Sequence, residues 1–257
     1  DAVLLMGPLY HLLTEDERLR ALTEARRVLK PGGPLFAAFI TRWAAHCDAA
    51  MKYPTEPLAH PADYAGIEQT GQLPPREGIR FVAYFAHPTE IEPLMRAATL
   101  DIVELLGVEG LVSAIEDAGV NALTGPAWAW WLEANWRAAH DPTMLGASEH
   151  ILAVARNPLW RAVLRDIAVT LRKAGLPFTV IGGASVALHG APIRVKDIDI
   201  QTTVEGAYRF GELFAAHVVS SVALSDNGVY RSHFGRFDFG GVDVEVMAAL
   251  ERWQDGR

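Results

Sequence analysis

Short apolar runs alternate with amphipathic stretches along most of the chain, which is typical of an α/β protein. Residues 2–6 are continuously apolar and predict a buried strand. A helix is expected after Thr14, because this capping residue precedes three acids and apolar positions then recur at helical spacing over 19–29. Further strands are expected at these apolar runs: 35–40, 81–85, 102–108 and 151–155.

The other stretches of the first half predict helices and loops. Residues 48–90 are rich in proline and glycine and predict short helices and loops. A helix is expected from Thr89 or Glu90 to about Thr99, and another over 111–140. The tryptophans of the second helix are interpreted as packing residues: Trp128, Trp130, Trp131 and Trp136.

Asn157-Pro158 is the expected boundary between two domains, 1–157 and 158–257, since a new run of helices and strands starts after it. An amphipathic helix is expected over 159–173, with Gly175 at its C-terminal cap. Shorter elements follow: strands at 178–181, 193–201, 230–239 and 242–246, and helices at 184–189 and 207–217. We expect each half to form its own core.

Composition narrows the class of protein. Half of the 257 residues are hydrophobic, which is enough for a sizeable core. The net charge of −8 argues against a nucleic-acid partner. Cys47 is the only cysteine, so an internal disulfide is excluded and a reducing cytoplasm is expected. No apolar run reaches the roughly 18 residues of a membrane span, so no membrane partner is expected.

Two strands of the second half carry acids at alternate positions. Asp197 and Asp199 share one strand face, and Asp243 and Glu245 share another. Clustered carboxylates repel each other, and they stay ionised when a cation lies between them. Oxygen ligands on a rigid sheet suit Mg²⁺. The four acids are therefore candidate metal ligands.

A glycine pair precedes these acids. Gly182-Gly183 stands where a strand turns into a short helix, so the backbone can approach a phosphate closely. Ser185 could add a hydroxyl group.

The glycine pair, the following Ala-Leu-His-Gly and the Asp-Ile-Asp-Ile segment together resemble the nucleotidyltransferase superfamily of the polymerase-β-like fold, over about residues 160–250. The resemblance implies these roles: phosphate binding by Gly182, Gly183 and Ser185, metal binding and catalysis by Asp197 and Asp199, and a third acid in Glu245 or Asp243, with Glu245 preferred. The sequence departs from the family pattern at the positions before the first acid. Many members have Arg and Thr or Ser where Ile193 and Val195 stand, with Arg194 and Lys196 offset as candidate nucleotide contacts.

The resemblance implies a metal-dependent enzyme that moves a nucleotidyl group from an NTP to a hydroxyl of a small molecule or protein. The superfamily includes antibiotic nucleotidyltransferases and toxins of toxin–antitoxin systems, so an antitoxin-like protein partner is one expectation. A non-catalytic domain that binds nucleotide or a partner is the alternative. The intact acid pair favours catalysis, and the altered positions before it favour the alternative.

The first half resembles class I S-adenosylmethionine-dependent methyltransferases over residues 1–157, through "DAVLLMGPLYHL", "RVLKPGG" and "LGASEHILAVARNP". The resemblance implies an incomplete doubly wound sheet in which Gly7, Tyr10 and His11 border methyl donor and acceptor; alternatively, Tyr10 and His11 only pack or cap there. No Gly-x-Gly-x-Gly turn occurs in these residues. We therefore expect S-adenosylmethionine to bind only in a longer parent protein, whose main activity would alternatively be methyl transfer.

Overall fold

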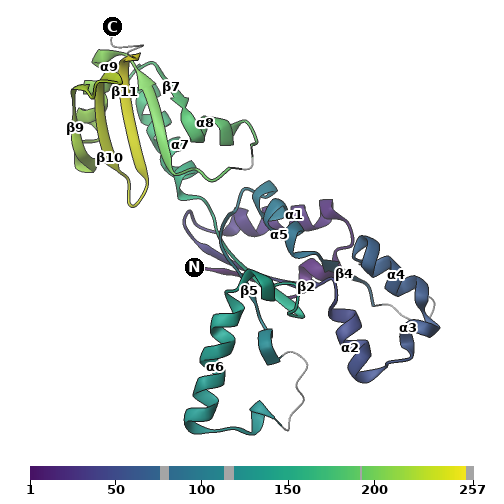
Figure 1. Ribbon diagram of the computed structural model, residues 1–257. Helices are drawn as coiled ribbons and strands as arrows, with labels where there is room; N and C mark the ends of the chain where they lie inside the picture. Colours follow the sequence, from purple (N-terminus) through teal and green to yellow (C-terminus); the bar gives the residue numbers. More distant parts are fainter. Residues whose placement is uncertain (76–80, 113–118, 192, 253–257) are drawn as a thin grey trace. The chain divides into compact units, whose positions relative to one another are not determined.

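The computed structural model describes residues 1–75, 81–112, 119–191 and 193–252 (Figure 1). The chain divides into two compact units, Asp1–Asn157 and Pro158–Arg257, each built around its own mixed sheet. The predicted α/β class is confirmed. Among the helices described, none is long and apolar enough to cross a membrane.

The first unit contains a sheet in the order β3-β4-β2-β6-β5, with β1 also paired to β2. The strands β1 and β4 run parallel to β2, whereas β6 is antiparallel to both β2 and β5. The strands are β1 (Val3–Leu5), β2 (Pro34–Thr41), β3 (Gln72–Leu73), β4 (Ala83–Ala86), β5 (Asp101–Gly107) and β6 (His150–Arg156). The helices are α1 (Glu15–Val28), α2 (Ala44–Lys52), α3 (Glu56–Ala59), α4 (Pro61–Thr70), α5 (Pro88–Ala97) and α6 (Gly125–Ala139).

Two clusters of buried side chains hold this unit together. Helix α1 starts at the expected cap, where Thr14 and Glu17 form a reciprocal capping box. Its apolar stripe packs with α5 against the sheet in the larger cluster, which includes Leu22, Ile91 and Met95. A smaller cluster joins Ile67 of α4 to β4 and α2. Helices α2 and α4 therefore pack in a different cluster from α1 and α5.

The predicted helix over 111–140 is wrong in its first half. The described residues there form short 3-10 turns at Gly110–Val112 and Val120–Ala122, and residues 113–118 lie outside the description. Helix α6 begins only at Gly125. Pro126 follows in its first turn, where a helix tolerates proline. The packing interpretation also fails for Trp130 and Trp136, which are 59% and 60% exposed.

The second unit contains a sheet in the order β7-β8-β11-β10-β9, in which only the β8–β11 pair is parallel. The elements are α7 (Leu159–Lys173), β7 (Phe178–Ile181), α8 (Gly182–Leu188), β8 (Asp197–Thr202), α9 (Val204–Leu213), β9 (Val218–Asp226), β10 (Tyr230–Asp238) and β11 (Asp243–Arg252). Apolar residues of the three helices pack with Ile198, Ile200, Val244 and Val246 of β8 and β11 in one core. One sheet face is thereby buried, and the alternate residues of these strands point away from it.

Several predicted boundaries in the second unit differ from the structure, and the largest difference is in β11, which was expected over 242–246 and continues to Arg252. The strand expected from 193 begins at Asp197, and the helix expected over 207–217 is α9, at Val204–Leu213. Strand β9 was not predicted, because nearly all of its residues are exposed and an edge strand of this kind lacks the apolar alternation that marks a buried one.

Candidate active site on the second sheet

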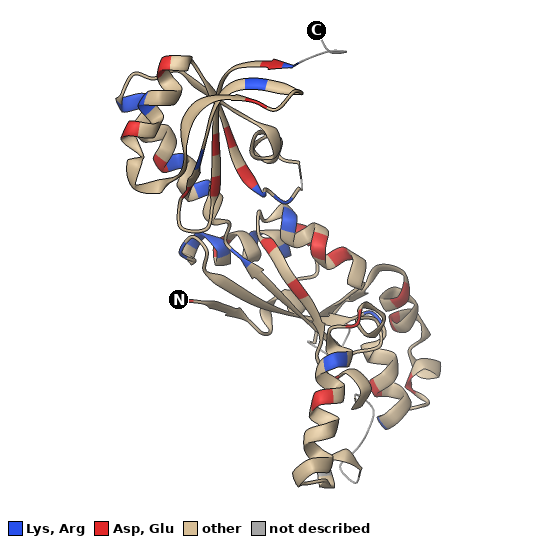
Figure 2. Cartoon of the chain, turned by 60° about the vertical axis from the view of Figure 1, so that its left-hand side comes forward, with Lys and Arg blue, Asp and Glu red and all other residues tan. Residues whose placement is uncertain are grey.

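Four acids lie in register on the two parallel strands at the centre of the second sheet. Asp197 is opposite Asp243, and Asp199 is opposite Glu245. Figure 2 shows the acidic positions following one another on these neighbouring strands. Asp197, Asp199 and Glu245 are partly buried, while Asp243 is exposed. The sheet therefore brings together all four acids predicted from the strand alternation.

The acids raise one another's proton affinity. Burial, followed by the charges of Asp197 and Glu245, raises the pKa of Asp199 to about 6. Burial and the charge of Asp197 also raise the pKa of Glu245, against the opposing effect of Arg236. The protein alone therefore places too little positive charge near these carboxylates to offset the burial and mutual repulsion of their ionised forms.

Gly182 is in contact with this cluster. The antiparallel pairing of β7 with β8 places Ile181 opposite Asp199, so the next residue borders the Asp199 carboxylate. Gly182 has φ +64°, and a Cβ atom there would lie 2.0 Å from Oδ2 of Asp199. The left-handed backbone conformation therefore favours glycine, and a larger residue would also displace the Asp199 carboxylate.

The other predicted phosphate and nucleotide residues lie around this turn. Gly183 and Ser185 are in the first turns of α8 and are partly buried. Among the described atoms, a Cβ atom on Gly183 would contact only the end of Ile193, at 4.0 Å, so the described backbone is open on that side. Arg194 and Lys196 are exposed and belong to the irregular segment before β8.

Arg236 was missed by the sequence reasoning. It lies directly opposite Glu245 in the β10–β11 hairpin. Its guanidinium group is 3.7 Å from Glu245 and 3.9 Å from Asp243. The Gly240-Gly241 pair between two predicted strands is a hairpin signal, and counting outward from it would have placed Arg236 beside the third acid.

The donor set fits a hard divalent cation such as Mg²⁺, because it consists of carboxylate oxygens whose mutual repulsion a cation would relieve. The carboxylates are adjacent without being gathered around one point. Within the part of the chain that the structure describes, no three His, Cys, Asp or Glu side chains are placed to hold a metal ion. Side-chain rotation would be needed to assemble the site.

The methyltransferase-related residues lie at a turn of the first unit. Gly7 follows β1, and Tyr10 and His11 belong to the 3-10 turn Pro8–His11. The Tyr10 hydroxyl donates to the Met6 carbonyl at 3.3 Å, and Nδ1 of His11 is 2.9 Å from the Val82 carbonyl. These contacts anchor the turn locally.

Comparison with known proteins supports the reading of the second unit. Residues 163–256 match the family model for aminoglycoside-2''-adenylyltransferase, which confirms the resemblance to nucleotidyltransferases there. No curated protein matches the chain. A Thermotoga maritima protein assigned as a nucleotidyltransferase shares 37% identity over 38% of this chain and 62% of that chain, with a TM-score of 0.36.

Two solved methyltransferases are also similar to the chain. A SAM-dependent methyltransferase from Methanosarcina mazei shares 16% identity over 62% of this chain and 59% of that chain, with a TM-score of 0.36. The CcbJ methyltransferase from Streptomyces caelestis shares 14% identity over 61% of this chain and 57% of that chain, with a TM-score of 0.32. The chain thus spans 57% to 62% of the length of these three proteins.

The raised pKa of Asp199 predicts how metal-free stability depends on pH. Its folded value of about 6 exceeds the reference value of 3.8. The stability that this group contributes is therefore fully present below the reference value and is lost as the pH rises through the folded value. With a chelator present, Asp199→Asn is expected to raise the melting temperature at about pH 7.5 and to change it little at about pH 4. A gain of equal size at both pH values would contradict this assignment.

Proposed function

We propose that the second unit is a metal-dependent nucleotidyltransferase, which moves a nucleotidyl group from an NTP to a hydroxyl group. The observation that carries the proposal is the register of β8 and β11, which pairs Asp197 with Asp243 and Asp199 with Glu245. The family match over 163–256 supports the same class. Asp197, Asp199 and one acid of β11 would hold Mg²⁺, which would neutralise charge on the triphosphate.

The chain's own residues have distinct roles in this proposal. Gly182 and Gly183 leave the backbone open for a phosphate group, and Ser185 is a nearby hydroxyl donor. Glu245 is the preferred third acid, because it is partly buried and directly opposite Asp199. In the reaction the acceptor oxygen forms a bond to the α-phosphorus, the bond to pyrophosphate breaks, and a carboxylate takes the hydroxyl proton.

The name of the matching family suggests an acceptor. It points to ATP as donor and to a hydroxyl group of an aminoglycoside as acceptor. We therefore propose an amino sugar as the first acceptor to test, with a protein hydroxyl as the second. The first unit is proposed to be related to methyltransferases, with Gly7, Tyr10 and His11 as the residues to test for contact with a methyl donor.

The test is pyrophosphate release from each of the four NTPs with Mg²⁺, in the presence and absence of an aminoglycoside. Release that requires both the metal and the acceptor, with a nucleotide-sized mass added to the acceptor, is the expected result. Absence of release with all four nucleotides, together with saturable nucleotide binding, would instead favour the non-catalytic alternative. The alternative is favoured by Ile193 and Val195, which stand where many nucleotidyltransferases have Arg and Thr or Ser.

Arg236 is expected to compete with the metal. Its guanidinium group lies near two candidate ligands and is about half exposed, so its ion pairs are weak. Arg236→Gln should tighten Mn²⁺ binding to the nucleotide-free chain about two- to fivefold, measured by calorimetry. Arg231→Gln is the matched control, because Arg231 pairs with Glu251 across the same two strands. Equal changes in both variants, or weaker binding by Arg236→Gln, would contradict the competition.

A further inference from the structure

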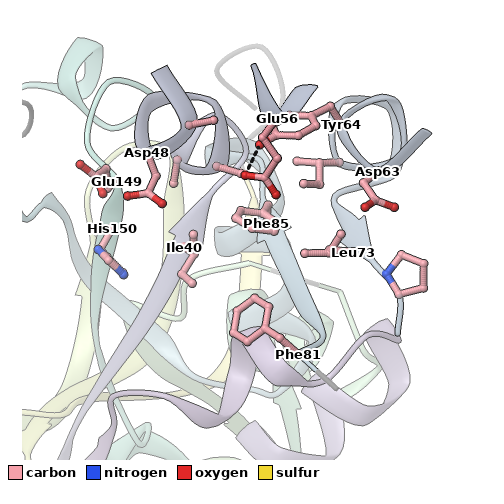
Figure 3. A pocket seen from close by; sticks show the side chains of 15 residues that line it. Ile40, Asp48, Glu56, Asp63, Tyr64, Leu73, Phe81, Phe85, Glu149 and His150 are labelled. Atoms are coloured by element: carbon pink, nitrogen blue, oxygen red, sulfur yellow. Dashed lines mark hydrogen bonds between the residues drawn. The ribbon is translucent and has the colours of Figure 1, made fainter. Parts of the chain in front are cut away.

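Two cavities of the first unit lie outside the candidate nucleotidyltransferase site. One has a volume of about 350 Å³ and is lined by α2, α4 and neighbouring elements (Figure 3). The other, the α1–α5 cavity, has a volume of about 310 Å³ and lies where the N-terminal turns of α1 and α5 meet β2 and β4. Its volume is in the range of small-molecule sites, and Phe39, Ile91 and Leu94 give it a buried apolar wall.

Arg18 of α1 lines the α1–α5 cavity although it is only 4% exposed. Its Nη1 donates to the Leu12 and Leu13 carbonyls at 2.7 and 3.0 Å. Its guanidinium carbon lies 3.4 Å from the centre of the Tyr84 ring. The other edge of the group has no partner in the described structure, because Nε is buried without a hydrogen bond and Nη2 forms none. A buried donor left in this way indicates a missing acceptor.

The carboxylates of the lining do not pair with Arg18. Glu90 accepts from Nη2 of Arg42 at 2.8 Å and from the Tyr84 hydroxyl at 2.5 Å. Glu15 is exposed, and among the described residues no carboxylate lies within ion-pair distance of the Arg18 guanidinium. Burial lowers the pKa of Arg18, against the opposing effects of Tyr84 and of nearby acids. A buried cation without a paired anion is costly, so an anion in the cavity would stabilise it.

We infer that the α1–α5 cavity binds a small organic carboxylate, a carboxyl group attached to an apolar ring or chain. The two oxygens of a carboxylate match the paired N–H donors of a guanidinium edge. The carboxylate would accept from Nε and Nη2 of Arg18. The apolar part of the ligand would lie against Phe39, Ile91 and Leu94.

The inference depends on the unpartnered edge of Arg18 and not on a positive net charge, since Glu15 and Glu90 also belong to the lining. The charge of Glu90 is balanced by Arg42, and solvent screens that of the exposed Glu15. The cavity shares no residue with the acids of β8 and β11, so this site is independent of the proposed nucleotidyl transfer.

Calorimetry on the full chain tests the inference with three probes. Benzoate is expected to bind saturably and at least about tenfold more tightly than benzamide, its uncharged analogue of similar size. Acetate carries the carboxylate without the ring, and it should bind at least about tenfold more weakly than benzoate. Equal affinity for benzoate and either of the other probes, or no saturable binding of benzoate, would overturn the inference.

Two variants on α1 locate the site. Arg18→Lys keeps the positive charge and loses the planar pair of donors, so it should weaken benzoate binding about tenfold. Glu15→Gln removes a carboxylate from the lining and should tighten benzoate binding about two- to threefold. Since Glu15 is exposed, its replacement leaves the core intact, and this variant decides the question if Arg18→Lys does not fold.

Glu24→Gln is the matched control, because Glu24 is another exposed acid of α1 and is not among the described lining residues. It pairs with Arg27 on its own helix at 2.7 Å. This variant should bind benzoate like the unmodified chain. Unchanged benzoate binding in a folded Arg18→Lys variant, or equal affinities of the Glu15→Gln and Glu24→Gln variants, would also overturn the inference.

Discussion

Asp199→Asn is expected to reduce Mg²⁺-dependent pyrophosphate release on the order of 10³-fold, while the chain stays folded. Asp199 is the central acid of the cluster: it faces Glu245 across the strand pair, shares a strand face with Asp197 and contacts the Gly182 turn. Replacement by the uncharged amide removes a metal ligand and changes the volume very little. Steady-state kinetics at saturating nucleotide would measure the loss.

The control for this prediction is Asp166→Asn. Asp166 lies on α7, is largely exposed and pairs only weakly with its neighbour Arg165 at 3.5 Å. It should leave turnover and melting temperature nearly unchanged. Full activity of Asp199→Asn, with an unchanged metal requirement, would refute the metal-site proposal while leaving the fold assignment intact.

Gly182→Ala is expected to destabilise the second unit by about 3 kcal/mol, and with it the nucleotidyl transfer activity. Two costs add at this position. An alanine at φ +64° is strained, and its Cβ would overlap the Asp199 carboxylate at 2.0 Å. Urea unfolding followed by circular dichroism would measure the shift in the transition of this unit.

Gly175→Ala separates the two costs. Gly175 has φ +68° but no described atom within 4 Å of the position of a Cβ atom, so Gly175→Ala should cost only about 1–2 kcal/mol. In an Asp199→Ala background, Gly182→Ala should cost no more than Gly175→Ala, because the overlapping carboxylate is gone. Equal costs for both glycines in the unmodified chain would show that the contact with Asp199 is not a constraint.

The acid cluster was predictable because it depends on local periodicity. Alternation along a strand places Asp197 and Asp199 on one face whatever the rest of the fold does. The parallel pairing that sets Glu245 against Asp199 is a long-range contact, and only the resemblance to nucleotidyltransferases suggested it. The contact of Gly182 with Asp199 likewise depends on the β7–β8 register, which no short stretch of sequence specifies.

The elements that were predicted wrongly or not at all also have physical explanations. Residues 111–140 look helical by composition, but Gly125-Pro126 marks where α6 starts and local apolar content does not reveal this. Strand β9 is paired on one edge only and buries almost nothing, so hydrogen bonding to β10 rather than apolar alternation defines it. The cavity lined by α2 and α4 (Figure 3) collects residues from seven helices and strands, and their meeting is a property of the tertiary structure.

The pairing of β8 with β11 also bears on how the chain reaches its folded state. A slip of one residue would turn Asp243 and Glu245 into the apolar core and expose Val244 and Val246. Both changes are costly, because unpaired carboxylates resist dehydration and the core loses apolar contacts. The residues assigned to chemistry therefore also exclude misaligned strand pairing during folding, and they would do so before any metal or nucleotide is present.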